Sequence, residues 1–126
     1  QIESGFWDEA TTKLTAEDQQ ELKQILEQAE GKLHNTPIEI PHREHRDLHL
    51  LIFRRLENDF VHGILQTYWD TYEAVGLHRY FDYSYYEGIW ASHRRMVESI
   101  LSQEYEAGKK VLAQHFTLLE NRLQTG

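Results

Sequence analysis

Apolar residues recur every three to four positions along most of this chain, which is the period of an amphipathic α-helix. No convincing stretch alternates apolar and polar residues in the way a half-buried strand does. A helix with one apolar stripe must bury that stripe against other helices. The sequence therefore predicts an all-α fold, and a length of 126 residues suits one domain over residues 1–126.

Caps and breakers divide the chain into helical segments. Thr15 followed by Asp18 resembles a capping box, and Pro37 and Pro41 bracket an extended link. Residues 1–14 are expected to form a linker or a short helix. We expect helices over 6–13, 15–34, 42 to a break at 58–59, 60–74 and 84–101, and a last helix after the turn at 102–104.

Composition excludes several classes of protein. A formal net charge of −8 argues against this segment binding nucleic acid by itself, because that affinity depends on Lys and Arg. The chain contains no cysteine, which excludes disulfides and thiolate chemistry and favours a reducing cytoplasm. No apolar run approaches membrane-spanning length, so no membrane partner is expected.

Four histidines are placed as metal ligands would be. His45 and His49 lie one helical turn apart, and His93 and His115 each fall on the apolar stripe of a later helix. Neutral imidazole is the commonest ligand for borderline divalent cations, and burying several imidazoles is costly unless they share a purpose. The alternative is that each one packs in the core and bonds a backbone carbonyl.

Aromatic residues and two arginines are candidates for binding a small ligand. Arg46 and Arg94 each neighbour a candidate ligand histidine in sequence, and an arginine fork binds carboxylates well. Amphipathic aromatic side chains are common in the walls of small-ligand cavities. The alternatives are surface ion pairs for the arginines and ordinary core packing for the aromatics, of which the candidates are Tyr68, Tyr72, Tyr86 and Trp90.

Several short motifs resemble the C-terminal effector domain, called FCD, of GntR-family transcriptional regulators of the fatty-acid-regulator-like subfamily. Residues 48–58 are similar to the family signature "FH, then Asn nine residues on". Residues 92–97 resemble its "EHR.I" segment, residues 104–108 its "GD.EAA" turn, and residues 114–116 its terminal "EHL". The separation of His93 from His115 also matches that of the family's last two ligand histidines.

The resemblance implies a fold and a role. It implies an antiparallel bundle of about six or seven helices with a buried effector cavity, and frequent homodimerisation. It also implies a divalent metal held by one Asp and three His, carried over here onto His49, His93 and His115. DNA would be read by a winged helix-turn-helix domain N-terminal to Gln1, which is absent from this chain.

The chain departs from the family pattern at one ligand position. Where the family has Asp four residues before its first histidine, this chain has His45, and Asp47 falls on another helix face. A four-histidine site would favour zinc or nickel over oxygen-preferring ions. Alternatively His45 does not ligate, which leaves three histidines and open positions for water or an effector.

The resemblance thus implies a ligand-sensing and dimerisation domain rather than an enzyme. Metal and a small organic acid would bind together, and the acid would modulate DNA binding by a dimer. One alternative is a metal-dependent enzyme, although the chain has no His-Glu-x-x-His motif and no Glu-x-x-His pair. The other alternative is a metal-free helical dimerisation module.

Overall fold

The computed structural model describes residues 2–75 and 83–114, which form helices and connecting segments with no strand among them. The all-α prediction is therefore confirmed. None of the described helices is long and apolar enough to span a membrane. The helices are α1 (Ile2–Gly5), α2 (Trp7–Thr11), α3 (Ala16–Leu33), α4 (His42–Ile52), α5 (Asp59–Val75) and α6 (Tyr83–Leu101), followed by a helical segment at 105–114.

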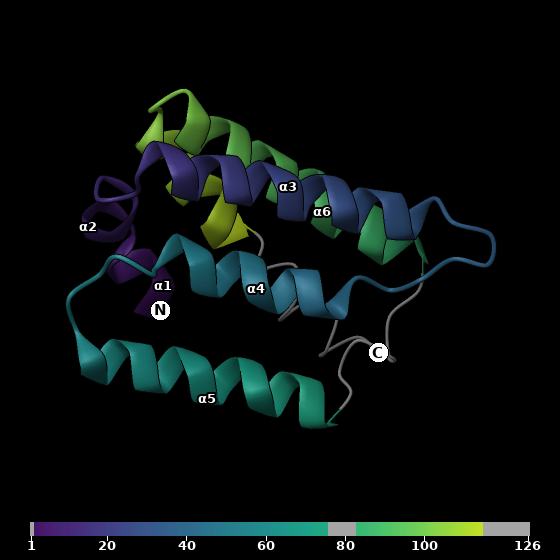
Figure 1. The fold of residues 1–126 in the computed structure, drawn as a ribbon, viewed down its shortest axis with the longest axis horizontal. Helices are drawn as coiled ribbons and strands as arrows, with labels where there is room; N and C mark the ends of the chain where they lie inside the picture. Colours follow the sequence, from purple (N-terminus) through teal and green to yellow (C-terminus); the bar gives the residue numbers. More distant parts are fainter. Residues whose placement is uncertain (1, 76–82, 115–126) are drawn as a thin grey trace.

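Helix α3 is central to the packing of the bundle. It contacts both α4 and α6, and α4 in turn contacts α5. Figure 1 shows α3, α4 and α5 lying one below another, with α6 behind α3 and the short helices α1 and α2 at one end. Helix α4 therefore has neighbours on two sides, and five of its eleven residues are buried: His45, Leu48, His49, Leu51 and Ile52.

The predicted capping box at the start of α3 is present. Thr15 Oγ1 accepts a hydrogen bond from the Asp18 amide at 3.1 Å, and Asp18 accepts one from the Thr15 amide at 2.9 Å. Asp18 also accepts a bond at 2.9 Å from Arg55, beyond the end of α4. The hydrogen bond from Arg55 holds the pKa of the Asp18 carboxyl well below its usual range, and bonds from Thr15 act in the same direction.

Two boundaries differ from the prediction. The segment expected at 6–13 begins earlier and forms the separate helices α1 and α2. Helix α4 ends at Ile52, although the apolar pattern continues to Leu56. Phe53 and Leu56 are still buried, because the chain turns there without leaving the core, and a buried turn gives the same local pattern as a helix. The Asn58 side chain then accepts from the Val61 amide at 3.1 Å and caps α5.

Trp7 ties the two ends of the described chain together. Its side chain is fully buried, its ring meets that of Phe53 edge-on at 6.4 Å, and its Nε1 donates to the Tyr105 carbonyl at 2.8 Å. Gly108 lies against it: a Cβ added there would clash with Ser99 Oγ and lie 2.8 Å from Trp7 Cζ2. The segment at 105–114 can therefore approach α6 only with glycine at this position.

We expect Asp18→Ala to lower the free energy of unfolding by about 1–2 kcal/mol, the usual cost of losing a helix cap. Because the folded-state pKa of Asp18 is lowered, its contribution is fully present above the unfolded pKa of about 3.9 and fades as pH falls through the folded pKa. Urea denaturation at pH 7 and below pH 4 measures this, with exposed Glu17→Ala as the control. Equal losses in both variants at pH 7 would contradict the assignment.

Gly108→Ala is expected to destabilise the fold by about 1–3 kcal/mol, because the methyl group overpacks a filled site. Gly31 and Gly63 have open space around them, so their Ala variants should be neutral or stabilising by up to about 1 kcal/mol. Thermal denaturation of the three variants checks the comparison. A Gly108→Ala protein as stable as the other two would mean that the close packing is absent in solution.

Candidate metal centre

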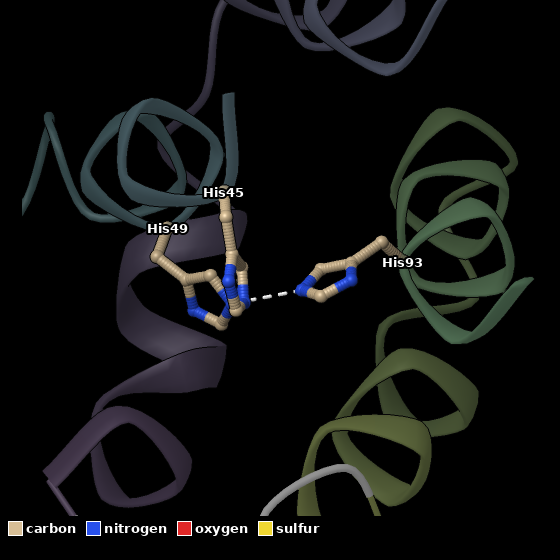
Figure 2. Close-up of side chains that lie close together, drawn as sticks. All are labelled: His45, His49 and His93. Atoms are coloured by element: carbon tan, nitrogen blue, oxygen red, sulfur yellow. Dashed lines mark hydrogen bonds between the residues drawn. The ribbon is translucent and has the colours of Figure 1, made fainter. Parts of the chain in front are cut away.

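Three of the four predicted ligand histidines converge in the interior. His45 and His49 come from one face of α4, and His93 comes from α6 (Figure 2). One ring nitrogen from each lies within 4.8 Å of the others. Their residues are 8%, 1% and 0% exposed, so these imidazoles are buried rather than solvated. The spacing of His45 and His49 by one helical turn is what places both on the inward face.

Within the cluster, His49 Nε2 and His93 Nε2 lie 3.0 Å apart. The other nitrogen of each ring faces an acceptor: His49 Nδ1 lies 2.6 Å from Glu3 Oε1, and His93 Nδ1 lies 2.8 Å from the Ile89 carbonyl oxygen. A carboxylate and a carbonyl both require a hydrogen on Nδ1, which leaves a lone pair on each Nε2. Two facing lone pairs repel unless a cation or a proton lies between them.

The donor set fits a transition metal. Nitrogen ligands bind zinc at about 2.0–2.1 Å in a tetrahedral arrangement, so two of them on one ion lie roughly 3.3 Å apart. The separation of 3.0 Å between the Nε2 atoms of His49 and His93 is slightly shorter than that value, so a small movement of the rings would accommodate the ion. Imidazoles favour zinc, nickel, cobalt and copper over magnesium and calcium, and within the described part of the chain no carboxylate joins the three-histidine group.

Glu3 was not identified from the sequence. This residue of α1 is 3% exposed, and its Oε2 accepts a hydrogen bond from Trp69 Nε1 at 3.3 Å while Oε1 faces His49. The expected helix began after Glu3, and no motif marks the position. Its pairing with His49 spans 46 residues of sequence, so only the folded structure reveals it.

Aromatic rings enclose the cluster, and a role of these side chains in binding an effector stays a prediction. Trp90 lies 4.7 Å from the His93 ring, and Tyr72 lies 5.7 Å from the His45 ring, measured between centroids. Trp69, which was not predicted as a binding residue, stacks at a tilt on His49 at 4.5 Å. These side chains are all nearly inaccessible to solvent, so the imidazoles lie in a medium of low polarity.

The two remaining predicted aromatic residues, Tyr68 and Tyr86, differ in exposure. Tyr86 is buried, whereas Tyr68 is 39% exposed and packs edge-on against Trp69 at 5.0 Å. Burial raises the pKa of the Tyr72 and Tyr86 phenols well above the ordinary value, and neighbouring tyrosines raise them further. Both phenols therefore stay protonated at neutral pH and can act as hydrogen-bond donors.

The two predicted arginines form ion pairs between helices. Arg46 bonds Asp70 of α5 at 3.1 Å. Arg94 pairs with Glu30 of α3 and, at 3.2 Å, with Glu98, and its side chain is 46% exposed. These contacts favour the alternative of surface ion pairs, and a role of either arginine in effector binding stays a prediction. His115 lies outside the described residues, so its role as a ligand also stays a prediction.

Comparison with known proteins agrees with the motifs. The family model of the FCD domain matches residues 1–118. No curated protein and no solved structure matches the chain. The match covers most of the chain, including the described residues of the bundle and all three clustered histidines. The chain therefore belongs to the FCD domain family, the ligand-sensing regulatory domains of GntR-type transcriptional regulators.

Proposed function

We propose that this domain binds a divalent transition metal through His45, His49 and His93, with His115 as a further ligand. The observation that carries the proposal is the 3.0 Å contact between two Nε2 atoms whose Nδ1 partners are both acceptors. A metal ion removes the repulsion between the lone pairs and uses all three imidazoles together. Zinc and nickel suit a ligand set in which His45 stands where the family pattern has Asp.

The bound metal would serve as the positive anchor for a small organic acid. When present, it supplies a Lewis-acidic contact for a carboxylate, which no arginine is seen to supply at this cluster among the described contacts. Trp90 and Tyr72 would form the apolar wall, and the protonated phenols of Tyr72 and Tyr86 would donate to the acid's oxygens. This chemistry favours a small, oxygen-rich acid over a long acyl chain.

In the whole regulator, acid binding would be coupled to DNA binding. Following the family pattern, we propose a cytoplasmic homodimer in which a winged helix-turn-helix domain precedes this one. The acid need only bind one arrangement of the dimer better than the other, and coupling of about 1–3 kcal/mol is typical. Helices α4 and α6 supply the clustered histidines, so a change in their spacing is the movement that an effector would bias.

A proton is the rival occupant of the cluster. A protonated His49 would donate to Glu3 from one nitrogen and to His93 from the other, and the 2.6 Å contact with Glu3 suits such an ion pair. That arrangement corresponds to the metal-free dimerisation module. Metal content distinguishes the two occupants directly.

We expect near-stoichiometric zinc or nickel in protein purified without a nickel column and measured by mass spectrometry. His93→Ala should lose the metal, because it removes a buried ligand, whereas His34→Ala should keep it. His34 is the matched control because it is an exposed histidine at the end of α3. A wild-type protein that stays metal-free after zinc and nickel are added would refute the proposed site and favour the protonated pair.

Small dicarboxylic and hydroxycarboxylic acids are expected to raise the melting temperature of the metal-loaded protein and to leave the apo protein unchanged, because a ligand of the folded state stabilises it. Tyr72→Phe should weaken acid binding by about threefold to tenfold, the usual value of one hydrogen bond. Tyr83→Phe, at an exposed position on α6, is the control. Equal stabilisation of the apo protein would show that the acid binds without the metal and would contradict the proposed anchor.

A further inference from the structure

Glu3 is a buried carboxylate held against the histidine cluster. Its side chain is 3% exposed, and each of its oxygens meets a ring nitrogen: Oε1 lies 2.6 Å from His49 Nδ1, and Oε2 lies 3.3 Å from Trp69 Nε1. Burying a carboxylate costs free energy unless it is paired and hydrogen-bonded. The two contacts, to α4 and to α5, compensate for that cost, so the burial of Glu3 depends on His49 and Trp69.

The orientation of His49 depends in turn on Glu3. A carboxylate at Nδ1 fixes the hydrogen there, turns Nε2 towards His93 and His45, and makes the ring a stronger donor to a cation. Trp69 stacks on the same ring at 4.5 Å and restricts its rotation. Glu3 thus bonds the nitrogen that faces away from the cluster and leaves the ligating nitrogen available.

Charge supports the same assignment. Neutral imidazoles do not compensate the charge of a divalent cation in a buried site, and the family pattern places a carboxylate where this chain has His45. Glu3 supplies a negative charge next to the ligand set without joining it. The family pattern has an Asp carboxylate among the metal ligands. In this chain the carboxylate of Glu3 takes its place, bonded to the ligand His49 rather than to the metal.

We infer that Glu3 is the positioning residue of the metal site and that it couples metal binding to the docking of α1. This inference rests on the proposed metal function. Helix α1 has four residues, too few to be stable alone, and Glu3 is its buried member. Metal bound at His49 strengthens the bond to Glu3, so by linkage the metal and the docked α1 stabilise each other to the same degree.

Glu3→Gln is expected to weaken zinc binding by about tenfold to a hundredfold, the usual effect of losing a carboxylate behind a metal-ligating histidine. Glu3→Asp, which keeps the charge, should recover part of that loss. The matched control is Glu9→Gln, the same change at an exposed position of α2 whose partner is Lys13, and it should bind zinc as wild type does. Competition titration against a chromophoric chelator measures all four affinities.

The wild-type protein provides a readout that needs no variant. Long-range proton–nitrogen NMR of the zinc-loaded chain should show His49 with its hydrogen on Nδ1 and the metal on Nε2.

Hydrogen exchange provides a second readout. Exchange of the α1 and α2 amides should slow on zinc binding in wild type, and this slowing should be lost in Glu3→Gln. If Glu3 has only a structural role, Glu3→Gln should lower the stability equally with and without zinc. The slowing of hydrogen exchange on zinc binding should then be the same in the variant as in wild type.

The outcomes separate the two proposals. A wild-type chain that binds no metal overturns the proposed function and this inference with it. A wild-type chain that binds zinc, together with a folded Glu3→Gln variant of equal affinity, overturns the role of Glu3 alone. If Glu3→Gln does not fold, a metal on Nδ1 of His49, or a hydrogen on its Nε2, in the wild-type NMR spectrum overturns that role.

Discussion

The contact between the Nε2 atoms of His49 and His93 is the constraint on which the rest of the site depends. Helix α3 packs against both α4 and α6, and those two helices also meet through imidazole and indole rings, such as His45 against Trp90 at 5.9 Å. Such a buried contact between helices is stable only if each ring nitrogen has a hydrogen-bond partner or binds a cation. The carboxylate and the carbonyl behind the two rings direct both lone pairs to one point, where a cation is favoured.

The same arrangement connects the bundle's architecture to regulation. The clustered histidines lie on α4 and α6, and the carboxylate behind His49 lies on α1, so a cation bound as proposed would affect how these three helices are held together. A bundle can respond to a small ligand when its helices have more than one packing of similar free energy. Enclosure by Trp69, Trp90 and Tyr72 strengthens each polar contact, because little water competes there.

Local patterns in the sequence predicted the features that depend on local geometry. The helical period, the Thr15 capping box and the spacing of His45 and His49 are set within a few residues, and the structure has all three. Glu3 could not be predicted, because its partner is distant in sequence. Arg94 follows His93 in the chain, yet successive residues on a helix point about 100° apart, so one faces the core and the other reaches Glu30 on α3.

The most direct test of the metal site is X-ray diffraction from crystals of the zinc-loaded chain, collected on both sides of the zinc absorption edge. The account predicts an anomalous peak among the ring nitrogens of His45, His49 and His93, at about 2.0–2.1 Å from the Nε2 atoms of His49 and His93. A peak confined to surface residues, or none in the interior, would contradict it and identify the cluster as a hydrogen-bonded part of the core.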